Sequence, residues 1–119
     1  GDGWMAAGST STEQSLKDLG RIREILKEQG RDEKSFWLSK RLYLAIDDNE
    51  SLARKKLTEA LNYHYGTDMS TVGLAATPSR AVEVLGQIRE AGARHILINP
   101  CYDHLRQMEL LATKIIPQL

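Results

Sequence analysis

Residues 36–46 read FWLSKRLYLAI, and this segment indicates the class of fold. Aromatic and branched side chains are typical of strands, and Asp47 and Asp48 follow where a strand would end. One face of this strand would carry Leu38, Leu42, Leu44 and Ile46. The other would carry the mixed set Trp37, Ser39, Arg41, Tyr43 and Ala45. A strand that is apolar on nearly both faces is typical of a parallel sheet covered by helices.

Helices are expected on either side of this strand. The stretch STEQ at residues 11–14 predicts a capping box, in which Ser11 accepts the Gln14 amide and the Gln14 side chain reaches back. Apolar residues then recur at helical spacing until Gly30, at positions Leu16, Leu19, Ile22, Ile25 and Leu26. After the strand, Asp48 or Asn49 caps a second helix that ends at residues 65–66. Its apolar side would be Leu52, Leu57, Ala60 and Leu61.

The second half of the chain repeats this alternation. Residues 67–76 show no period and are predicted to be a loop. A helix starts at Thr77 and Pro78, and residues 94–100 form a short buried strand. Asp103 would cap a last helix with the apolar stripe Leu105, Met108, Leu111, Ala112 and Ile115. With GDGWM at residues 1–5 as a further strand, all strands are joined through helices, which requires parallel pairing.

The composition describes a single globular unit, residues 1–119. Hydrophobic residues make up 41% and charged residues 27%, and no apolar run approaches the ~18 residues that span a bilayer. Sixteen basic residues balance sixteen acidic ones along the chain, which argues against a nucleic-acid partner. The single cysteine, Cys101, excludes an internal disulfide, and no apolar leader is present, so a cytoplasmic protein is expected.

Six short motifs follow one another along nearly the whole chain. They are DGW (2–4), GRD (30–32), RLYLAIDD (41–48), ATPS (76–79), AGARHILINP (91–100) and IIPQL (115–119). No single motif is specific, but their order and spacing resemble the C-terminal part of the bacterial luciferase-like monooxygenase family. Those proteins are flavin- or deazaflavin-dependent oxidoreductases built on a parallel eight-stranded α/β barrel. One departure is Ala76, where the family usually has glycine.

The resemblance implies that residues 1–119 are the C-terminal portion of a (β/α)8 TIM-type barrel whose earlier strands lie outside this polypeptide. It implies FMN or a deazaflavin as the cofactor of the full-length family, and an isolated fragment that is weakly active or inactive and need not bind the cofactor. The expected partner is a second copy of the chain or the missing N-terminal part of the barrel. The alternative function is a complete small α/β module without catalytic activity that self-associates and so covers its open strand edges.

Parallel barrels carry their functional groups at the carboxyl ends of strands and in the loops that follow. The candidates for cofactor binding are Trp4, Asn99 and Tyr102, which lie at such places, and Arg41, which sits mid-strand among apolar neighbours. Trp4 either walls a flavin ring or fills the core. Arg41 either grips a phosphate or carboxylate of the cofactor or substrate, or forms an ion pair with a carboxylate on a neighbouring strand. No catalytic residue is assigned.

A metal site is not expected. Cys101 and His104 stand three residues apart and His95 lies nearby, but a structural zinc site needs four such ligands, and the remaining His64 belongs to another helix. No glycine-rich phosphate loop is present, so neighbouring strands would have to provide most of any flavin site.

Overall fold

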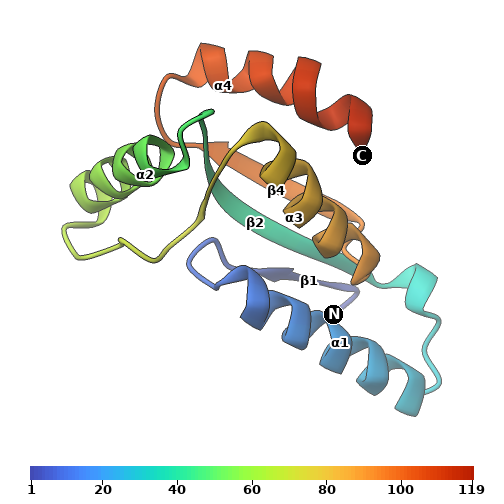
Figure 1. Ribbon diagram of the computed structural model, residues 1–119. Helices are drawn as coiled ribbons and strands as arrows, with labels where there is room; N and C mark the ends of the chain where they lie inside the picture. The colour runs from blue at the N-terminus through green and yellow to red at the C-terminus, as the bar shows by residue number, and fades with distance from the viewer.

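The computed structural model describes residues 1–119 as helices packed on a four-stranded parallel sheet (Figure 1). The strands are β1 (Gly3–Ala6), β2 (Trp37–Ile46), β3 (Leu74–Ala76) and β4 (His95–Pro100). The helices are α1 (Thr12–Glu28), α2 (Glu50–Tyr65), α3 (Pro78–Glu90) and α4 (His104–Leu110). A short 3-10 turn precedes β2 at Glu33–Ser35, and α4 continues as a π-helical turn, Leu111–Ile115, and a 3-10 turn, Ile116–Gln118. The helices are all too short or too polar to cross a membrane.

β2 is the central strand, and every pairing in the sheet involves it. β1 lies beside its first half, with Gly3 opposite Trp37, and β3 lies beside its last three residues on the same edge. β4 runs along the other edge, from Ser39 opposite His95 to Leu44 opposite Pro100. Since all pairs are parallel and joined by helices, the predicted α/β class is confirmed.

The prediction that residues 67–76 form a loop is wrong at its end. Leu74, Ala75 and Ala76 pair with the last three residues of β2 and form β3. Three residues are too few for an alternating pattern to appear in the sequence. The backbone reaches this position through Gly73, whose φ of 77° favours glycine and whose missing side chain leaves room for Tyr43.

The main core lies between the sheet and helices α1, α3 and α4. Alternate residues of β2 point into it, as the sequence predicts for Leu38, Leu42, Leu44 and Ile46. They pack against Leu19 of α1, Leu85 and Ile88 of α3, and Leu111 and Ile115 after α4. In Figure 1 this is the face of the sheet in front of which α1 and α3 run.

The opposite face of the sheet is covered only at its carboxyl end, by α2. Ala53, Leu57 and Leu61 of that helix form a second, smaller core with Tyr43, Ala45 and Ala75. The remainder of this face is open, and Met5, Trp37 and Leu97 are 44%, 55% and 40% exposed. The predicted helix cover is therefore complete on one face and partial on the other.

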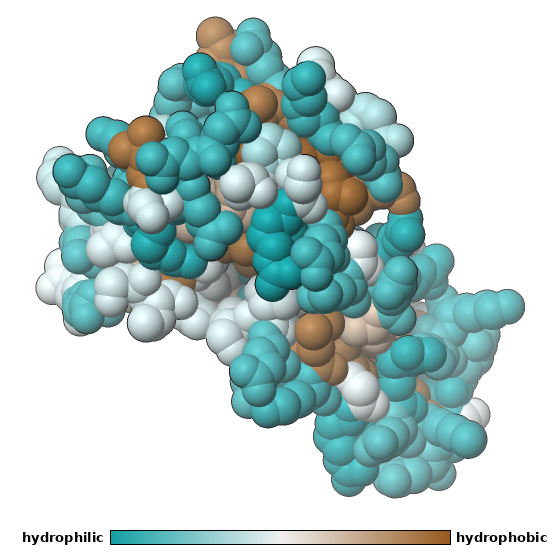
Figure 2. Space-filling view, in the orientation of Figure 1, coloured by the Kyte–Doolittle hydropathy of each residue, from teal (hydrophilic) through white to brown (hydrophobic).

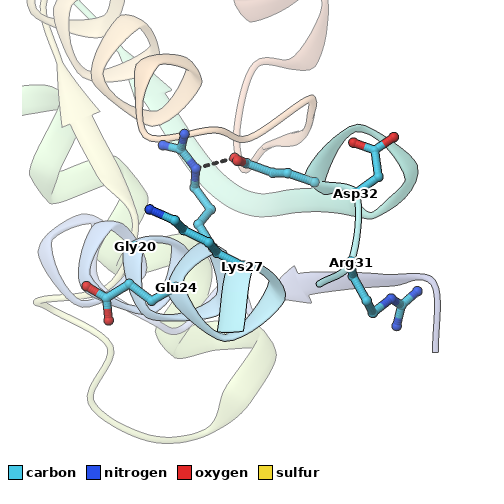
Figure 3. Close-up of a pocket in the computed structure, with 7 residues that line it drawn as sticks. Gly20, Glu24, Lys27, Arg31 and Asp32 are labelled. Carbon is cyan, nitrogen blue, oxygen red and sulfur yellow. Dashed lines mark hydrogen bonds and ion pairs between the residues drawn. The ribbon is translucent and has the colours of Figure 1, made fainter. Parts of the chain in front are cut away.

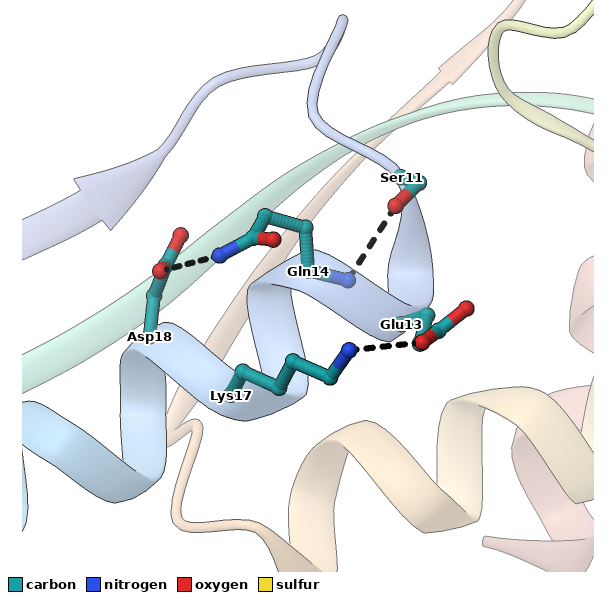
Figure 4. A network of polar contacts seen from close by, with 5 residues as sticks. All are labelled: Ser11, Glu13, Gln14, Lys17 and Asp18. Atoms are coloured by element: carbon teal, nitrogen blue, oxygen red, sulfur yellow. Dashed lines mark hydrogen bonds and ion pairs between the residues drawn. The ribbon is translucent and has the colours of Figure 1, made fainter.

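The starts of α1, α2 and α3 follow the sequence signals, except for one side chain in α1. The Ser11 hydroxyl accepts a hydrogen bond from the Gln14 amide at 3.1 Å, as predicted. The Gln14 side chain does not reach back, because its amide donates to Asp18 at 2.7 Å one turn further on (Figure 4). Asn49 and Thr77 cap α2 and α3 through their side chains.

The prediction for α4 is wrong in its cap and in part of its apolar stripe. Asp103 adopts a left-handed conformation with φ of 39° and makes no side-chain cap bond. Leu105 and Met108 are 76% and 57% exposed, whereas Gln107 is fully buried. Figure 2 shows hydrophobic atoms along α4 at the top of the molecule. A polar residue faces the sheet here because its amide group satisfies the backbone at the end of β2.

Candidate functional site

Two adjoining cavities lie under α2 on the partly covered face of the sheet. Their volumes are about 530 and 420 Å³. Arg41, Tyr43 and Tyr65 line both cavities and form the wall between them. The cavities lie toward the carboxyl ends of β1, β2 and β4, which is where parallel α/β proteins bind ligands. We call them the apolar cavity and the polar cavity.

The apolar cavity is the larger one. Beyond the shared wall it is lined by Met5 and Ala6 of β1, by residues 7–9 of the loop that follows β1, and by Met69. Methionine and alanine side chains offer an adaptable, uncharged surface. A flat apolar group is therefore the ligand that suits this cavity best.

The polar cavity lies on the side of β4. Beyond the shared wall its polar lining is His64 of α2, Asn99 of β4, Cys101 and His104. None of its lining residues is acidic. Burial raises the pKa of the Cys101 thiol, so this cysteine is a neutral wall residue and a poor nucleophile.

Arg41 is held between the two cavities without a carboxylate. Its Nε donates to the Asn99 side-chain oxygen at 3.1 Å, and its guanidinium lies 5.1 Å from the centre of the Tyr43 ring. No acidic side chain of residues 1–119 lies within 4 Å of it, so the predicted ion pair finds no partner within this chain. The two Nη nitrogens make no hydrogen bond within the chain, and they remain available to a ligand.

The tyrosine pair Tyr43 and Tyr65 ties α2 to the sheet at the site. Their hydroxyl groups share a hydrogen bond, and their rings meet edge to face at 6.1 Å. This hydrogen bond, followed by burial, raises the pKa of Tyr43, so its hydroxyl stays protonated at neutral pH. A Cβ on Gly8 would lie 2.6 Å from the Tyr43 ring, so only glycine lets the loop after β1 approach so closely.

Lys40 is a site-supporting residue that the sequence analysis missed. Its side chain is fully buried, and its Nζ donates to the carbonyl oxygens of Ala7 and Thr10 at 2.6 and 2.8 Å. It thereby holds the loop that lines the apolar cavity. The sequence does contain an indication of this role, because Lys40 is a charged residue on the apolar face of β2, between Leu38 and Leu42.

The structure brings two of the four predicted cofactor-binding residues together, namely Arg41 and Asn99. Trp4 packs against the main core on the helix-covered face and lines neither cavity, which is the position expected of the core interpretation. The Tyr102 hydroxyl donates to the Ile46 carbonyl at 3.4 Å, and burial raises the pKa of that tyrosine. Roles of Trp4 and Tyr102 toward a cofactor stay predictions.

No group of three or more His, Cys, Asp or Glu side chains lies close enough together to hold a metal ion. Another hollow, of about 510 Å³, lies between the second half of α1 and the turn before β2 (Figure 3). Its lining is Gly20, Arg23, Glu24, Lys27, Arg31, Asp32 and Glu33. Three basic and three acidic side chains in this lining balance in charge. Arg23 forms an ion pair with Glu33, and Arg31 points away from the hollow and bonds Asp2. This hollow is a solvated, charged surface beside the amino end of β2.

Parallel strands joined by helices, with cavities toward their carboxyl ends, define a parallel α/β fold. Among the solved structures that share this fold are two enzymes that depend on coenzyme F420. One is the coenzyme F420 dependent tetrahydromethanopterin reductase from Methanopyrus kandleri, with a TM-score of 0.70 and 16% identity. The other is an F420-dependent secondary alcohol dehydrogenase in complex with an F420-acetone adduct, with a TM-score of 0.73 and 15% identity.

The chain spans less than half the length of these enzymes. It is covered over 98% and 99% of its own length, against 45% and 43% of theirs. At such low identity the comparison establishes the fold alone. No protein-family model matches the sequence, and no curated protein sequence matches it significantly.

Proposed function

We propose that this chain is the C-terminal segment of a luciferase-like oxidoreductase that uses a deazaflavin or FMN. The observation that carries the proposal is the pair of cavities toward the carboxyl ends of the parallel strands, one apolar and one polar. Both compared enzymes are named for their dependence on F420, which favours the deazaflavin over FMN. A monooxygenase reaction and a cytoplasmic location stay predictions.

The residues present fit part of a flavin site. The apolar cavity has a volume and a lining suited to one side of a planar ring, between Met5 and Met69. Arg41 lines it as well, and Asn99 lies beyond Arg41 in the polar cavity, where a ribityl chain or a charged group would lie. When bound, a flavin or deazaflavin supplies hydride chemistry, and this chain's residues contribute binding, orientation and exclusion of water.

This chain provides only one wall of such a site. The face opposite the helices is open at Met5, Trp37 and Leu97, so further strands or a second copy would have to enclose a bound ring. We therefore propose weak or absent turnover for residues 1–119 alone. The second candidate function, a self-associating module without catalysis, is supported by the same open face.

The test is a titration of the purified chain with FMN and with a deazaflavin, followed by quenching of their fluorescence. The proposal expects saturable binding, tighter for the deazaflavin, that weakens when Met69→Lys places a charge in the apolar cavity. Met108→Lys, at an exposed position of α4, is the matched control and should leave binding unchanged. Equal binding by wild type and Met69→Lys would contradict a cofactor site in the apolar cavity, and no binding by a folded chain would show that residues 1–119 alone hold no cofactor.

A further inference from the structure

We infer that the polar cavity is a binding site for a small anionic group, a phosphate or a carboxylate, with Arg41 as its anchor. The inference rests on the proposed function in that it concerns the same pair of cavities. It differs in that it can be tested without any flavin.

The charge of the polar cavity favours an anion. Its nine lining residues include one arginine and two of the three histidines of the chain, and none is acidic. In a protein with sixteen acidic and sixteen basic residues, a cavity without any carboxylate is a local departure from neutrality. An anion that enters it meets a fixed positive charge and no repulsion from the lining.

The guanidinium of Arg41 is held in a way that leaves its outer nitrogens free. The Asn99 oxygen fixes Arg41 through Nε, and the Tyr43 ring supports one flat side of the group. Both Nη nitrogens are left without a partner in the chain, and a bidentate anion is the ligand that matches two parallel N–H donors. Arg54 shows the contrast, because its Nη nitrogens donate to the carbonyls of Val72 and Gly73 at 2.9 and 3.1 Å.

The surroundings of the guanidinium add hydrogen-bond donors and no negative charge. The raised pKa keeps the Tyr43 hydroxyl protonated, and because the Tyr43 and Tyr65 hydroxyls share one hydrogen bond, the pair has one O–H left to donate. Burial raises the pKa of the Cys101 thiol and keeps it neutral. The side-chain amide of Asn99 uses its oxygen for Arg41, which leaves its nitrogen available as a donor. The cavity therefore offers donors to an anion, and its volume of about 420 Å³ accommodates a phosphate with part of an organic group.

The experiment is calorimetric titration of the purified chain with inorganic phosphate and with acetate. Arg41→Gln should weaken binding by roughly 10- to 100-fold, the range expected when a charge-assisted hydrogen bond is lost. Arg89→Gln removes an exposed arginine of α3 that has no partner and should leave binding unchanged. If wild type binds neither anion, or if Arg41→Gln binds as tightly as wild type, the inference is wrong.

A second variant guards against misfolding of Arg41→Gln. Asn99→Asp keeps the contact to Arg41 but supplies a carboxylate that occupies the guanidinium, so anion binding should be lost while the unfolding temperature is kept or raised. A stable Asn99→Asp protein that still binds phosphate as wild type does would overturn the inference.

Competition identifies the molecule to which the anion belongs. If phosphate displaces FMN but not riboflavin, which lacks the phosphate, the site holds the phosphate of the cofactor. If phosphate and FMN bind together, the site holds an anionic substrate; both results support the anion site. Phosphate binding without any flavin binding would leave the anion site standing and remove the support for the proposed function.

Discussion

Lys40 is a residue whose burial is explained by the loop that it holds. Its ammonium lies on the apolar face of β2 with no carboxylate beside it, and its only hydrogen bonds are to the carbonyl oxygens of Ala7 and Thr10. A buried charge without a counter-ion is costly, but leaving two loop carbonyls unpaired in the same place is costly as well. The buried lysine therefore fixes the shape of the loop after β1 through these two hydrogen bonds.

Replacing this lysine should destabilise the protein. Lys40→Met removes both donors and leaves two carbonyls unsatisfied, which should lower the free energy of unfolding by about 1–3 kcal/mol. Urea denaturation measures the change, with Lys27→Met at an exposed position of α1 as the control within about 0.5 kcal/mol. Equal stability of the two variants would show that the carbonyls find other partners.

The same residue should make stability depend on pH. Burial lowers the pKa of Lys40 below its ordinary value of 10.5. Between the lowered pKa and 10.5 the unfolded chain binds a proton that the folded chain does not, so the free energy of unfolding rises with pH in that interval. The neutral amine keeps two donors for its two carbonyls. Wild type should therefore gain stability relative to Lys40→Met as the pH approaches 10.5.

At the scale of the element, α4 is fixed to the sheet by one buried amide. Gln107 accepts a hydrogen bond from the Ile46 amide at 2.8 Å and donates to the Ile46 carbonyl at 2.9 Å. The side-chain amide of Gln107 thus bonds the N–H and the C=O of Ile46 as the backbone of a neighbouring strand would. The helix is thereby positioned through a polar contact inside an otherwise apolar interface.

Gln107→Leu should therefore destabilise the protein although it makes the helix more apolar. The Ile46 carbonyl keeps a long bond from Tyr102, but the Ile46 amide loses its partner, at a cost of about 1–3 kcal/mol. Leu105→Gln, which changes a residue that is 76% exposed, should be nearly neutral. Thermal denaturation of both variants tests which face of α4 packs on the sheet. If the face predicted from the sequence were the buried one, Leu105→Gln would lower the unfolding temperature more than Gln107→Leu.

The sequence predicts the elements well because caps and periods are local. Ser11, Asn49, Thr77 and Gly66 end or begin helices through contacts a few residues away, and all four act as expected. The errors concern contacts that are distant along the chain. Gln107 and Lys40 are buried because they bond backbone carbonyls or amides thirty or more residues away. The contact between Arg41 and Asn99 is of this kind too, because it depends on how β2 and β4 align.

At the scale of the whole molecule, the protein is thin and only half covered. Its dimensions are 46 × 34 × 19 Å, and its radius of gyration is 15.1 Å. A compact domain of this length would have a radius of gyration of about 13.5 Å. Only 26 of 119 residues are buried, since one face of the sheet lacks a second layer of helices over most of its length.

We propose that this open face associates with a second copy when no other strands cover it. Light scattering of the purified chain should then give a mass above 13.4 kDa, and Trp37→Lys combined with Leu97→Glu should shift it toward the monomer. Tyr63→Lys, at an exposed position of α2, is the control. A compact wild-type monomer that unfolds cooperatively would contradict this proposal.

The central position of β2 also determines how the protein can open. β1, β3 and β4 each pair with β2 and with no other strand. Any one of them can detach in a local fluctuation while the remaining two stay paired, whereas release of β2 dissolves the whole sheet at once. The amide protons of Arg41 to Leu44 are thus the ones whose exchange with solvent reports global unfolding, and those of β3, held by three residues, report the most frequent partial opening.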